Sequence, residues 1–191
     1  LDEKVIKTVY ETFKKLWDDG LIYRGERIVN YSTKYQTSYA DIEVNYKQEK
    51  GTLWQIAYPL IDQVGEIVVA TTRPETMLGD VAIAVNPTDE RYKHLIGTKA
   101  HLPIVDREIP IIADDYVDKN YGTGAVKITP AHDPNDFEIG KRHNLKPIQV
   151  IGFDGTMINV PQHYMGLDIE TARKRVLTDI EIAEFTRGES Q

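Results

Sequence analysis

The chain has 191 residues, of which 41% are hydrophobic and none is cysteine, and its formal net charge is −7. This length and apolar content can bury one real core, so we expect a single soluble unit, and the lack of cysteine excludes disulfides, thiolate nucleophiles and cysteine-based zinc sites. The acidic charge argues against a broad basic face for nucleic acid, so any such contact should be local.

The amino-terminal part of the chain predicts a helix and a β-ribbon. Residues 1–4 show neither an initiator methionine nor the apolar region of a signal peptide, which is typical of a segment taken from a longer chain. Apolar residues then recur at helical spacing and Gly20 follows as a stop, which predicts an amphipathic helix over roughly residues 3–19. The β-prone stretches 27–31 and 42–46 flank a polar turn region and predict a ribbon or arm.

The remainder predicts a β-rich core interrupted by short helices. Strand-like stretches bounded by Gly, Pro, Asp and Asn lie at residues 52–60, 66–72, 81–85, 108–113, 124–129 and 147–151. Helical stretches lie at about residues 87–96, 134–143 and 168–183. Because the strands do not alternate regularly with long helices, we predict an α+β fold with a barrel-like core rather than a doubly wound sheet.

No stretch of the chain predicts a membrane span. An apolar run of roughly 20 residues would be needed, and none approaches that length. We therefore expect no membrane partner. The missing cysteine fits a cytoplasmic location.

One polar group of residues follows the stretch 66–72. Thr71, Thr72 and Arg73 come at the end of an apolar run, and Thr76 follows shortly after Pro74. Threonine favours strands and Pro74 predicts a turn, so a plain polar strand exit is one interpretation. The other is that these hydroxyls and exposed amides hold a ribose or a carbonyl, with Arg73 near a phosphate.

A second polar group occupies residues 121–136. Gly122 and Gly124 let the backbone adopt positive φ or approach a ligand closely, and Pro130 ends the strand. The polar residues beyond are then presented at a strand end, where loops on a rigid scaffold commonly carry function.

The acidic residues of this group have a structural and a functional interpretation. Asp133 before Pro134 predicts a helix N-cap. Asp136 falls in the first turn, where the helix dipole stabilises a negative charge. By strand alternation Lys127 and Thr129 share one face, which is either solvated or the wall of a pocket.

Metal and nucleophile chemistry find little support. His132, Asp133, Asp136 and His143 are close in sequence, but their spacing matches neither the zincin pattern nor an EF-hand. The chain has no recognisable Ser-His-Asp triad, nucleophile elbow or phosphate-cradling loop. We expect neither a metal nor another cofactor.

Two long blocks closely resemble the editing domain of the valyl-tRNA synthetases, namely ATTRPETMLGD at residues 70–80 and GTGAVKITPAHDPNDFE at residues 122–138. The threonine-rich and Gly-Thr-Gly parts are shared with the isoleucyl and leucyl relatives, whereas residues 127–129 and 133–136 look specifically valyl. Residues 20–25 resemble the segment by which the catalytic fold enters this insertion, and residues 166–168 resemble its return.

The resemblance implies a division of the single unit and a limited activity. Residues 1–46 would form the amino-terminal helix and ribbon arm, 47–165 the editing core, and 166–191 the returning helix and tail. Many relatives carry a zinc-type cysteine pair in the arm, whereas this chain reads NYSTKY at residues 30–35, so that zinc site is not expected. The His-Ile-Gly-His and Lys-Met-Ser-Lys-Ser motifs of ATP-dependent aminoacylation are missing, so this segment should edit without charging.

The resemblance also implies residue roles. Asp136 would bind the substrate's α-ammonium, and Asp133, Lys127 and Thr129 would read the threonyl hydroxyl. The residues expected to hold the ester and the terminal adenosine are Thr71, Thr72, Arg73, Thr76, Tyr121, Gly122, Thr123 and His132, with Tyr121 stacking on the base. Water would attack the ester without a protein general base.

The implied function is hydrolysis of threonyl-tRNA(Val). The discrimination of valine from threonine known for this family's synthetic site is only about a hundredfold, and a second, editing site supplies the rest. The implied partners are the aminoacylated 3′ CCA end of tRNA(Val) and the remainder of the parent synthetase, and we expect a monomer. A noncatalytic module that docks the tRNA end and a metal-dependent esterase remain as alternatives.

Overall fold

The computed structural model describes residues 2–190, so residues 1 and 191, the outer limits of the predicted unit, lie outside the described part. The elements follow in the order α1 (Glu3–Asp18), β1 (Asn30–Ser32), β2 (Thr37–Tyr39), η1 (Asp41–Glu43), β3 (Leu53–Pro59), β4 (Glu66–Thr71), η2 (Pro74–Gly79), β5 (Ala82–Val85), η3 (Lys93–Leu95), β6 (Lys99–Leu102), β7 (Arg107–Ala113), β8 (Ala125–Ile128), α2 (Pro134–Arg142), α3 (Ile169–Ile182) and β9 (Thr186–Ser190). The fold is α+β, as predicted.

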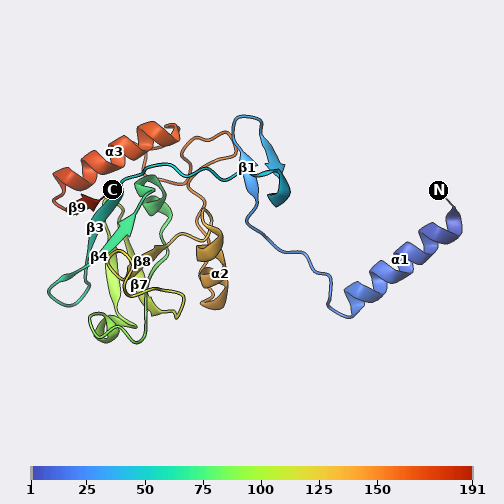
Figure 1. Ribbon diagram of the computed structural model, residues 1–191, viewed down its shortest axis with the longest axis horizontal. Coiled ribbons are helices and arrows are strands. Elements are labelled where there is room, and N and C mark those ends of the chain that lie inside the picture. Colours follow the sequence, from blue (N-terminus) through green and yellow to red (C-terminus); the bar gives the residue numbers. More distant parts are fainter. Residues whose placement is uncertain (1, 191) are drawn as a thin grey trace.

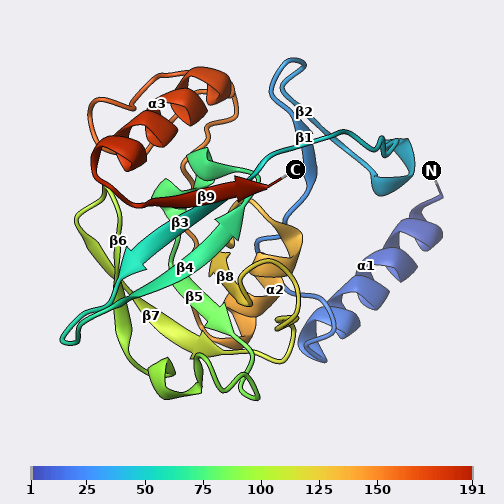
Figure 2. The same ribbon diagram turned by 60° about the vertical axis from the view of Figure 1, so that its left-hand side comes forward.

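Two small sheets form the core. One has the strand order β4-β3-β9 and the other β6-β7-β5-β8, and β1 pairs with β2 in a separate ribbon. All neighbours are antiparallel except β5 and β7. A single bridge between Leu60 and Ala100 links the edges of the two sheets. Figure 2 shows β9, β3 and β4 side by side, with β5, β7 and β8 beyond them. The sheets surround a common core, but they do not close into a barrel.

The main core fills the space between these sheets and α3. Side chains at alternate positions of β3 and β4, including Ile56, Tyr58 and Val69, are buried there, as strand geometry requires for one face of a sheet. Helix α3 contributes Ala172, Val176 and Ile180, which recur every four residues and form one apolar stripe. A smaller cluster, which includes Ile128 and Ile139, packs α2 against β8 and β5. The polar loops after β4 and β8 are thereby fixed to a packed scaffold.

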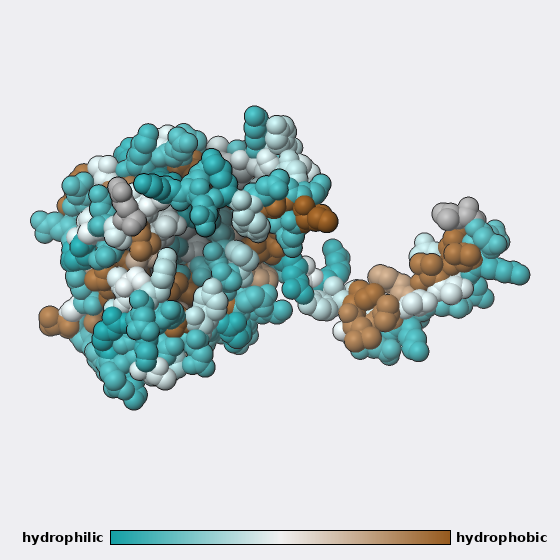
Figure 3. Space-filling view, viewed as in Figure 1, coloured by the Kyte–Doolittle hydropathy of each residue, from teal (hydrophilic) through white to brown (hydrophobic). Residues whose placement is uncertain are grey.

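Helix α1 stands apart from this body. Figure 1 shows it joined to the ribbon by an extended segment, and none of its residues is buried. Its apolar side chains form a brown stripe in Figure 3, and Phe13 and Trp17 stack on each other. The helix forms as predicted because its apolar residues keep helical spacing and the Asp2 side chain accepts a hydrogen bond from the Lys4 amide at 2.8 Å.

Two predicted strands are wrong, and a predicted helix is mostly wrong. The stretch 42–46 is no strand: β1 pairs with Thr37–Tyr39 instead, and the Ile42 and Tyr46 side chains find no core to pack on. The stretch 147–151 makes only one isolated bridge, between Ile151 and Met157. Residues 87–96 form turns and the short η3, because the Asn86 and Asp89 side chains accept local backbone hydrogen bonds that compete with a helix.

Besides β2 of the ribbon, two strands of the core are missing from the prediction. Strand β9 has the polar sequence TRGES and lies at the edge of its sheet, where burial does not impose an apolar pattern. Strand β6 has only four residues, two of them basic, and alternates between exposed or half-buried and buried positions. Both form because a neighbouring strand offers backbone hydrogen bonds, which the local sequence does not reveal.

Candidate functional site

A polar pocket of about 230 Å³ lies where β4, η2, β8 and the start of α2 meet. It is lined by Leu53, Ala70, Thr71, Thr72, Arg73, Thr76, Tyr121, Val126, Lys127, Thr129, His132, Asp133 and Asp136. The two polar sequence blocks, about 50 residues apart, therefore contribute to one cavity. Of the predicted site residues, only Gly122 and Thr123 are not part of its lining.

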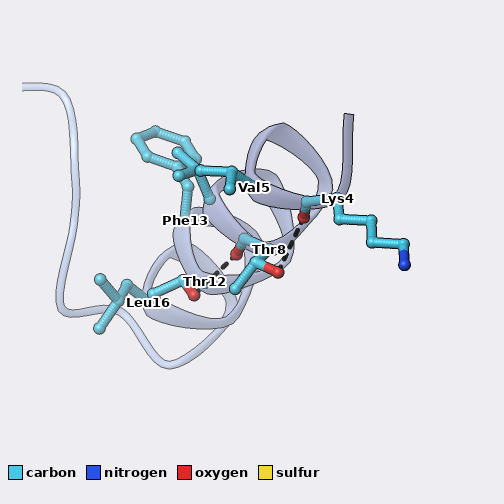
Figure 4. Close-up of a pocket in the computed structure, with 7 residues that line it drawn as sticks. Lys4, Val5, Thr8, Thr12, Phe13 and Leu16 are labelled. Atoms are coloured by element: carbon cyan, nitrogen blue, oxygen red, sulfur yellow. Dashed lines mark hydrogen bonds between the residues drawn. The ribbon is translucent and has the colours of Figure 1, made fainter. Parts of the chain in front are cut away.

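A larger hollow of about 540 Å³ occurs on α1, but its chemistry is poor. Figure 4 shows that all its lining side chains come from this one helix. The hydroxyls of Thr8 and Thr12 donate to the helix's own carbonyls, at 3.0 and 2.8 Å. Ligand sites are usually pockets in which polar groups converge from several elements, so we place the site in the smaller pocket.

The start of α2 fixes both acidic side chains of the pocket. Asp133 is the N-cap residue, and its Oδ1 accepts hydrogen bonds from the amides of Asn135 at 2.8 Å and Asp136 at 3.1 Å. Pro134 occupies the first helical position, where its missing N–H costs nothing. Asp136 turns back toward β8, and its Oδ2 accepts from the Thr129 amide at 2.8 Å. The cap and the strand end thus hold the two carboxylates in place.

Asp136 is set up to receive a cation. Its side chain is buried, and burial is the main reason why its pKa rises from 3.8 to about 6. Among residues 2–190 no hydrogen bond reaches its second oxygen, Oδ1. At neutral pH the pocket therefore holds a carboxylate with one oxygen available to a ligand.

Lys127 is buried, and its ammonium group is fully hydrogen-bonded within the protein. Its Nζ donates to Thr129 Oγ1 at 2.6 Å and to Thr76 Oγ1 and Asp80 Oδ1 at 3.0 Å each. Only 7% of the residue is exposed. An ammonium has three hydrogens, so all of them are used in the absence of a ligand. A substrate can reach the Lys127 ammonium directly only by displacing one of these partners.

Asp80 and Tyr58 complete this buried cluster from behind. Asp80 is completely buried, and its Oδ1 also accepts from the Thr129 hydroxyl at 2.6 Å. The Tyr58 hydroxyl donates to Asp80 Oδ2 at 2.7 Å. Burial raises the pKa of Asp80, while the Lys127 ammonium and three hydrogen bonds oppose that rise. We treat Asp80 and Lys127 as an ion pair, because Asp80 is the one carboxylate that contacts this ammonium within the described chain.

His132 is oriented as a neutral structural group. Its Nε2 accepts a hydrogen bond from the Val150 amide at 2.9 Å, so the ring proton must be on Nδ1. Burial, helped by the nearby cations of Arg73 and Lys127, lowers the pKa of His132 to about 4. With its Nε2 lone pair engaged, His132 is poorly suited to act as a general base.

The mouth of the pocket carries exposed groups. Arg73 Nη1 donates to the His132 carbonyl at 3.0 Å, and its Nε lies 3.5 Å from the buried Glu75, which Arg173 also pairs. Tyr121 is 71% exposed and lies on the loop that leads into β8. A cation and an aromatic face are thus presented toward solvent beside the polar interior.

Arg91 and Tyr92 fix the loop of residues 119–124 through hydrogen bonds to its backbone carbonyls. Arg91 Nη2 donates to the Lys119 carbonyl at 2.6 Å, and the Tyr92 hydroxyl donates to the Thr123 carbonyl at 2.9 Å. Gly124 has φ of +77°, and a Cβ there would collide with Arg91 and the Lys119 carbonyl. Both the positive φ and these close contacts favour glycine at position 124. Gly122, with φ of +56°, and Thr123 lie in the same loop outside the pocket lining.

Sequence reasoning missed the residues behind the pocket wall. Asp80 closes the first quoted block, yet nothing local shows that it is buried or that its cation lies 47 positions away. Tyr58 belongs to a strand that reads as ordinary core. An acid directly after a glycine, flanked by apolar runs, is the only local signal for Asp80, and it is a weak one.

The residues considered for a metal do not form a cluster of ligands within residues 2–190, although His132, Asp133 and Asp136 line the same pocket. His132 bonds to Val150, Asp136 to Thr129, and His143 Nε2 lies 2.9 Å from Asp114 instead. No group of three or more His, Cys, Asp or Glu side chains suited to a metal ion occurs within residues 2–190. Over the same residues, no helix combines the length and apolar character needed to cross a membrane.

Comparison with known proteins gives consistent matches over nearly the whole chain. The family model for tRNA synthetases class I (I, L, M and V) matches residues 1–187. The valine–tRNA ligase of Geobacillus stearothermophilus is 60% identical over 181 residues, which cover 95% of this chain and 21% of that protein. The valine–tRNA ligases of Bacillus subtilis and Clostridium tetani are 57% and 54% identical, over 96% and 97% of this chain and 21% of each relative.

The fold itself has a solved counterpart. The crystal structure of GlLeuRS-CP1 matches with a TM-score of 0.59 at 13% identity, over 73% of this chain and 99% of that one. At this identity the match bears on the fold alone. The chain spans about a fifth of the length of the curated relatives it matches.

Proposed function

Since the chain belongs to the class I tRNA synthetases (I, L, M and V), we propose that its core is an editing hydrolase that releases threonine from mischarged threonyl-tRNA(Val). The relatives named valine–tRNA ligase support the choice of tRNA. The fold of GlLeuRS-CP1, which we interpret as the connective-peptide insertion of a leucyl-tRNA synthetase, supports an editing role.

The observation that carries this proposal is the composition of the 230 Å³ pocket. Its volume lies below the range of about 300–1,000 Å³ that accommodates drug-sized ligands, so it suits an aminoacyl group better than a whole nucleoside. Asp136 offers one free carboxylate oxygen to the α-ammonium that every aminoacyl ester carries. Asp133, Thr129 and Thr76 add acceptors to the lining of the same cavity.

Discrimination would act on the side chain. The hydroxyl of a threonyl group can form a hydrogen bond with the polar lining of the pocket. The methyl group that valine carries in its place cannot. The threonyl ester therefore gains a hydrogen bond, worth about 0.5–1.5 kcal/mol, that the valyl ester cannot make. Lys127 supports this reading through the Thr76 and Thr129 hydroxyls that it holds.

The mouth of the pocket would receive the end of the tRNA. Arg73 can pair with a phosphate, and the Tyr121 ring can stack on the terminal adenine. Thr71 and Thr72, at the end of β4, would face the ribose and the ester. A local contact of this kind is compatible with a net charge of −7, which disfavours a broad phosphate-binding face.

The reaction consumes one water. The water oxygen attacks the ester carbonyl carbon, the bond between that carbon and the ribose oxygen breaks, and the ribose oxygen recovers a proton. The products are threonine and tRNA(Val) with a free 3′ end. Because His132 has its Nε2 engaged, the proposed mechanism relies on positioning and on the substrate's own hydroxyl. The remainder of the parent synthetase, in the cytoplasm, would supply charging and most of the tRNA contacts.

The test is deacylation of two esters by the chain. We expect threonine to be released from threonyl-tRNA(Val) much faster than valine from valyl-tRNA(Val), with no valine-dependent exchange between ATP and pyrophosphate. Asp136→Ala should abolish hydrolysis of both esters, because the ammonium contact is common to them. Equal rates on both esters, or full activity of a folded Asp136→Ala protein, would contradict the proposal.

A chelator separates this function from the esterase alternative. Hydrolysis should continue in EDTA at a concentration that leaves the tRNA folded. Loss of activity that one specific metal restores would favour the metal-dependent esterase. Binding of threonyl-tRNA(Val) without turnover would favour the noncatalytic docking module.

A further inference from the structure

Lys127, Thr76, Thr129 and Asp80 form a buried cluster in which every polar hydrogen can be assigned to an acceptor. The Lys127 ammonium can only donate, and its three hydrogens go to Thr76, Asp80 and Thr129. Both threonine hydroxyls therefore act as acceptors toward Lys127. Each hydroxyl must send its own single hydrogen elsewhere.

Those two hydrogens also have fixed destinations. The Thr76 hydroxyl donates to the Arg73 carbonyl at 2.9 Å, and a carbonyl can only accept. The Thr129 hydroxyl lies 2.6 Å from Asp80 Oδ1 and donates to that carboxylate. Each hydrogen of the Lys127 ammonium and of the two threonine hydroxyls is thus donated to a partner within the protein. What each hydroxyl retains is one lone pair.

Both of these threonines line the pocket, whereas Asp80 does not. The carboxylates of Asp133 and Asp136 are acceptors as well, so this part of the lining offers acceptors and no free donor among its engaged hydroxyls and ammonium. Asp80 is completely buried and is held in turn by the Tyr58 hydroxyl at 2.7 Å. It can influence a ligand only through the groups it fixes.

We propose that Asp80, supported by Tyr58, is a positioning residue that sets the proton direction of the Thr129 hydroxyl, so that the pocket accepts a hydrogen bond from the substrate side chain. This inference rests on the editing function proposed above and specifies how its selectivity arises. A threonyl hydroxyl can donate into such a wall. A valyl methyl cannot, so the ester of the correct amino acid gains nothing there.

The conservative change Asp80→Asn tests the inference. The amide oxygen must face the Lys127 ammonium, so the Thr129 hydroxyl then donates to a neutral acceptor that fixes its hydrogen less firmly than the carboxylate does. Lys127 also loses its counter-charge. We expect the ratio of kcat/KM for the threonyl ester to that for the valyl ester to fall by about fivefold to tenfold, the size of one lost hydrogen bond. The fall should come from the threonyl ester.

A matched control is available in Asp114→Asn. Asp114 is also buried and paired, with Arg142 and His143, but it lies outside the pocket lining. Its substitution should lower the melting temperature and leave the selectivity ratio at the wild-type value. A general effect of disturbing a buried carboxylate would instead lower the ratio in both variants and would overturn the inference.

Tyr58→Phe keeps the test decisive if Asp80→Asn does not fold. This change preserves both charges and removes one hydrogen bond to Asp80. A ratio reduced by about threefold supports the inference, because Asp80 has lost part of its anchorage. A wild-type ratio in folded Asp80→Asn, or in Tyr58→Phe where Asp80→Asn does not fold, overturns it. A wild-type chain that hydrolyses neither ester would instead refute the editing function itself.

Discussion

The Lys127 ammonium is the most constrained charge in the pocket, because it is buried and pairs with a carboxylate that is itself fully buried. Replacing one member of such a pair leaves the other charge unpaired, which costs about 3–5 kcal/mol. Lys127→Met should therefore lower the free energy of unfolding by about that amount. The double variant Lys127→Met with Asp80→Asn should recover most of the loss, since neither member of the pair is then charged.

Urea unfolding of the wild type, the single and the double variant measures this effect. If Lys127→Met were as stable as the double variant, the two groups would not form an ion pair. The same unfolding curve shows whether Lys127→Met is folded in the absence of urea. Only then can its selectivity between the two esters be interpreted.

Asp136 predicts opposite responses of activity and stability to pH. Its pKa in the folded chain is about 6 and its ordinary value is 3.8, so the fold favours the protonated form and stability declines as pH rises between those values. Binding an ammonium needs the ionised form. We therefore expect kcat/KM for the threonyl ester to rise with pH along an acidic limb with a midpoint near 6.

The measurement is the deacylation rate between about pH 5 and pH 7.5, corrected for spontaneous ester hydrolysis. Asp136→Asn should be slow and should lack the limb. It should also show a weaker decline of melting temperature over the acidic range. An unchanged limb in Asp136→Asn would assign the titration to another group.

At the scale of single residues, the sequence predicts the residues that line the pocket better than the buried residues that hold them in place. Thr71, Arg73, Lys127 and Asp136 belong to recognisable blocks, and the fold brings them to one cavity. Asp80 was not predicted as part of the site, because its significance comes from complete burial and from a partner 47 residues away. Burial and long-range pairing follow from the packed structure and leave little trace in local sequence.

At the scale of elements, the N-terminus of α2 combines capping with the pocket. Asp133 caps the helix through two backbone amides, and the helix start places Asp136 against β8. Asp133→Ala should cost about 0.5–2 kcal/mol of stability through the lost cap. Asp133→Asn keeps a capping oxygen, so it should retain that stability.

Comparing Asp133→Ala with Asp133→Asn distinguishes helix capping by Asp133 from recognition of the substrate. If Asp133 only caps the helix, Asp133→Asn should match the wild type in melting temperature and in hydrolysis of both esters. If its carboxylate also reads the substrate, as we propose, Asp133→Asn should be stable yet less selective for the threonyl ester. Loss of stability in Asp133→Asn equal to that in Asp133→Ala would show that capping here depends on charge.

The elements themselves were predictable where one face is buried. Strands β3, β4, β5, β7 and β8 and helices α2 and α3 follow the apolar periodicity of their sequences. Edge strand β9 does not, β6 alternates over only four residues, and residues 147–151 make only an isolated bridge. Their pairing is decided by which neighbouring strand edge is free, a property of the assembled sheets.

For the whole molecule, the body and α1 are energetically separate. Helix α1 has no buried residue, and Val9, Phe13 and Trp17 of its apolar stripe are exposed. Figure 1 shows the helix apart from the body, and Figure 3 shows its brown apolar surface open to solvent. The ribbon, by contrast, touches the body: Tyr31 packs edge-on against Phe153 with ring centroids 5.2 Å apart. The stability of the pocket therefore depends on the body and the ribbon contact and not on α1.

Deletion of residues 2–19 should accordingly leave the melting temperature of the body and the hydrolysis of threonyl-tRNA(Val) unchanged. Removal of an exposed apolar stripe should also reduce self-association at high concentration, since such surfaces promote contacts between molecules. The comparison needs calorimetry, deacylation and light scattering on the full and the shortened chain. The matched control is Tyr31→Ala, which should lower the melting temperature because it removes an aromatic contact with the body. A lower melting temperature in the shortened chain would mean that α1 packs on the body in solution, and its apolar face would then be part of the fold.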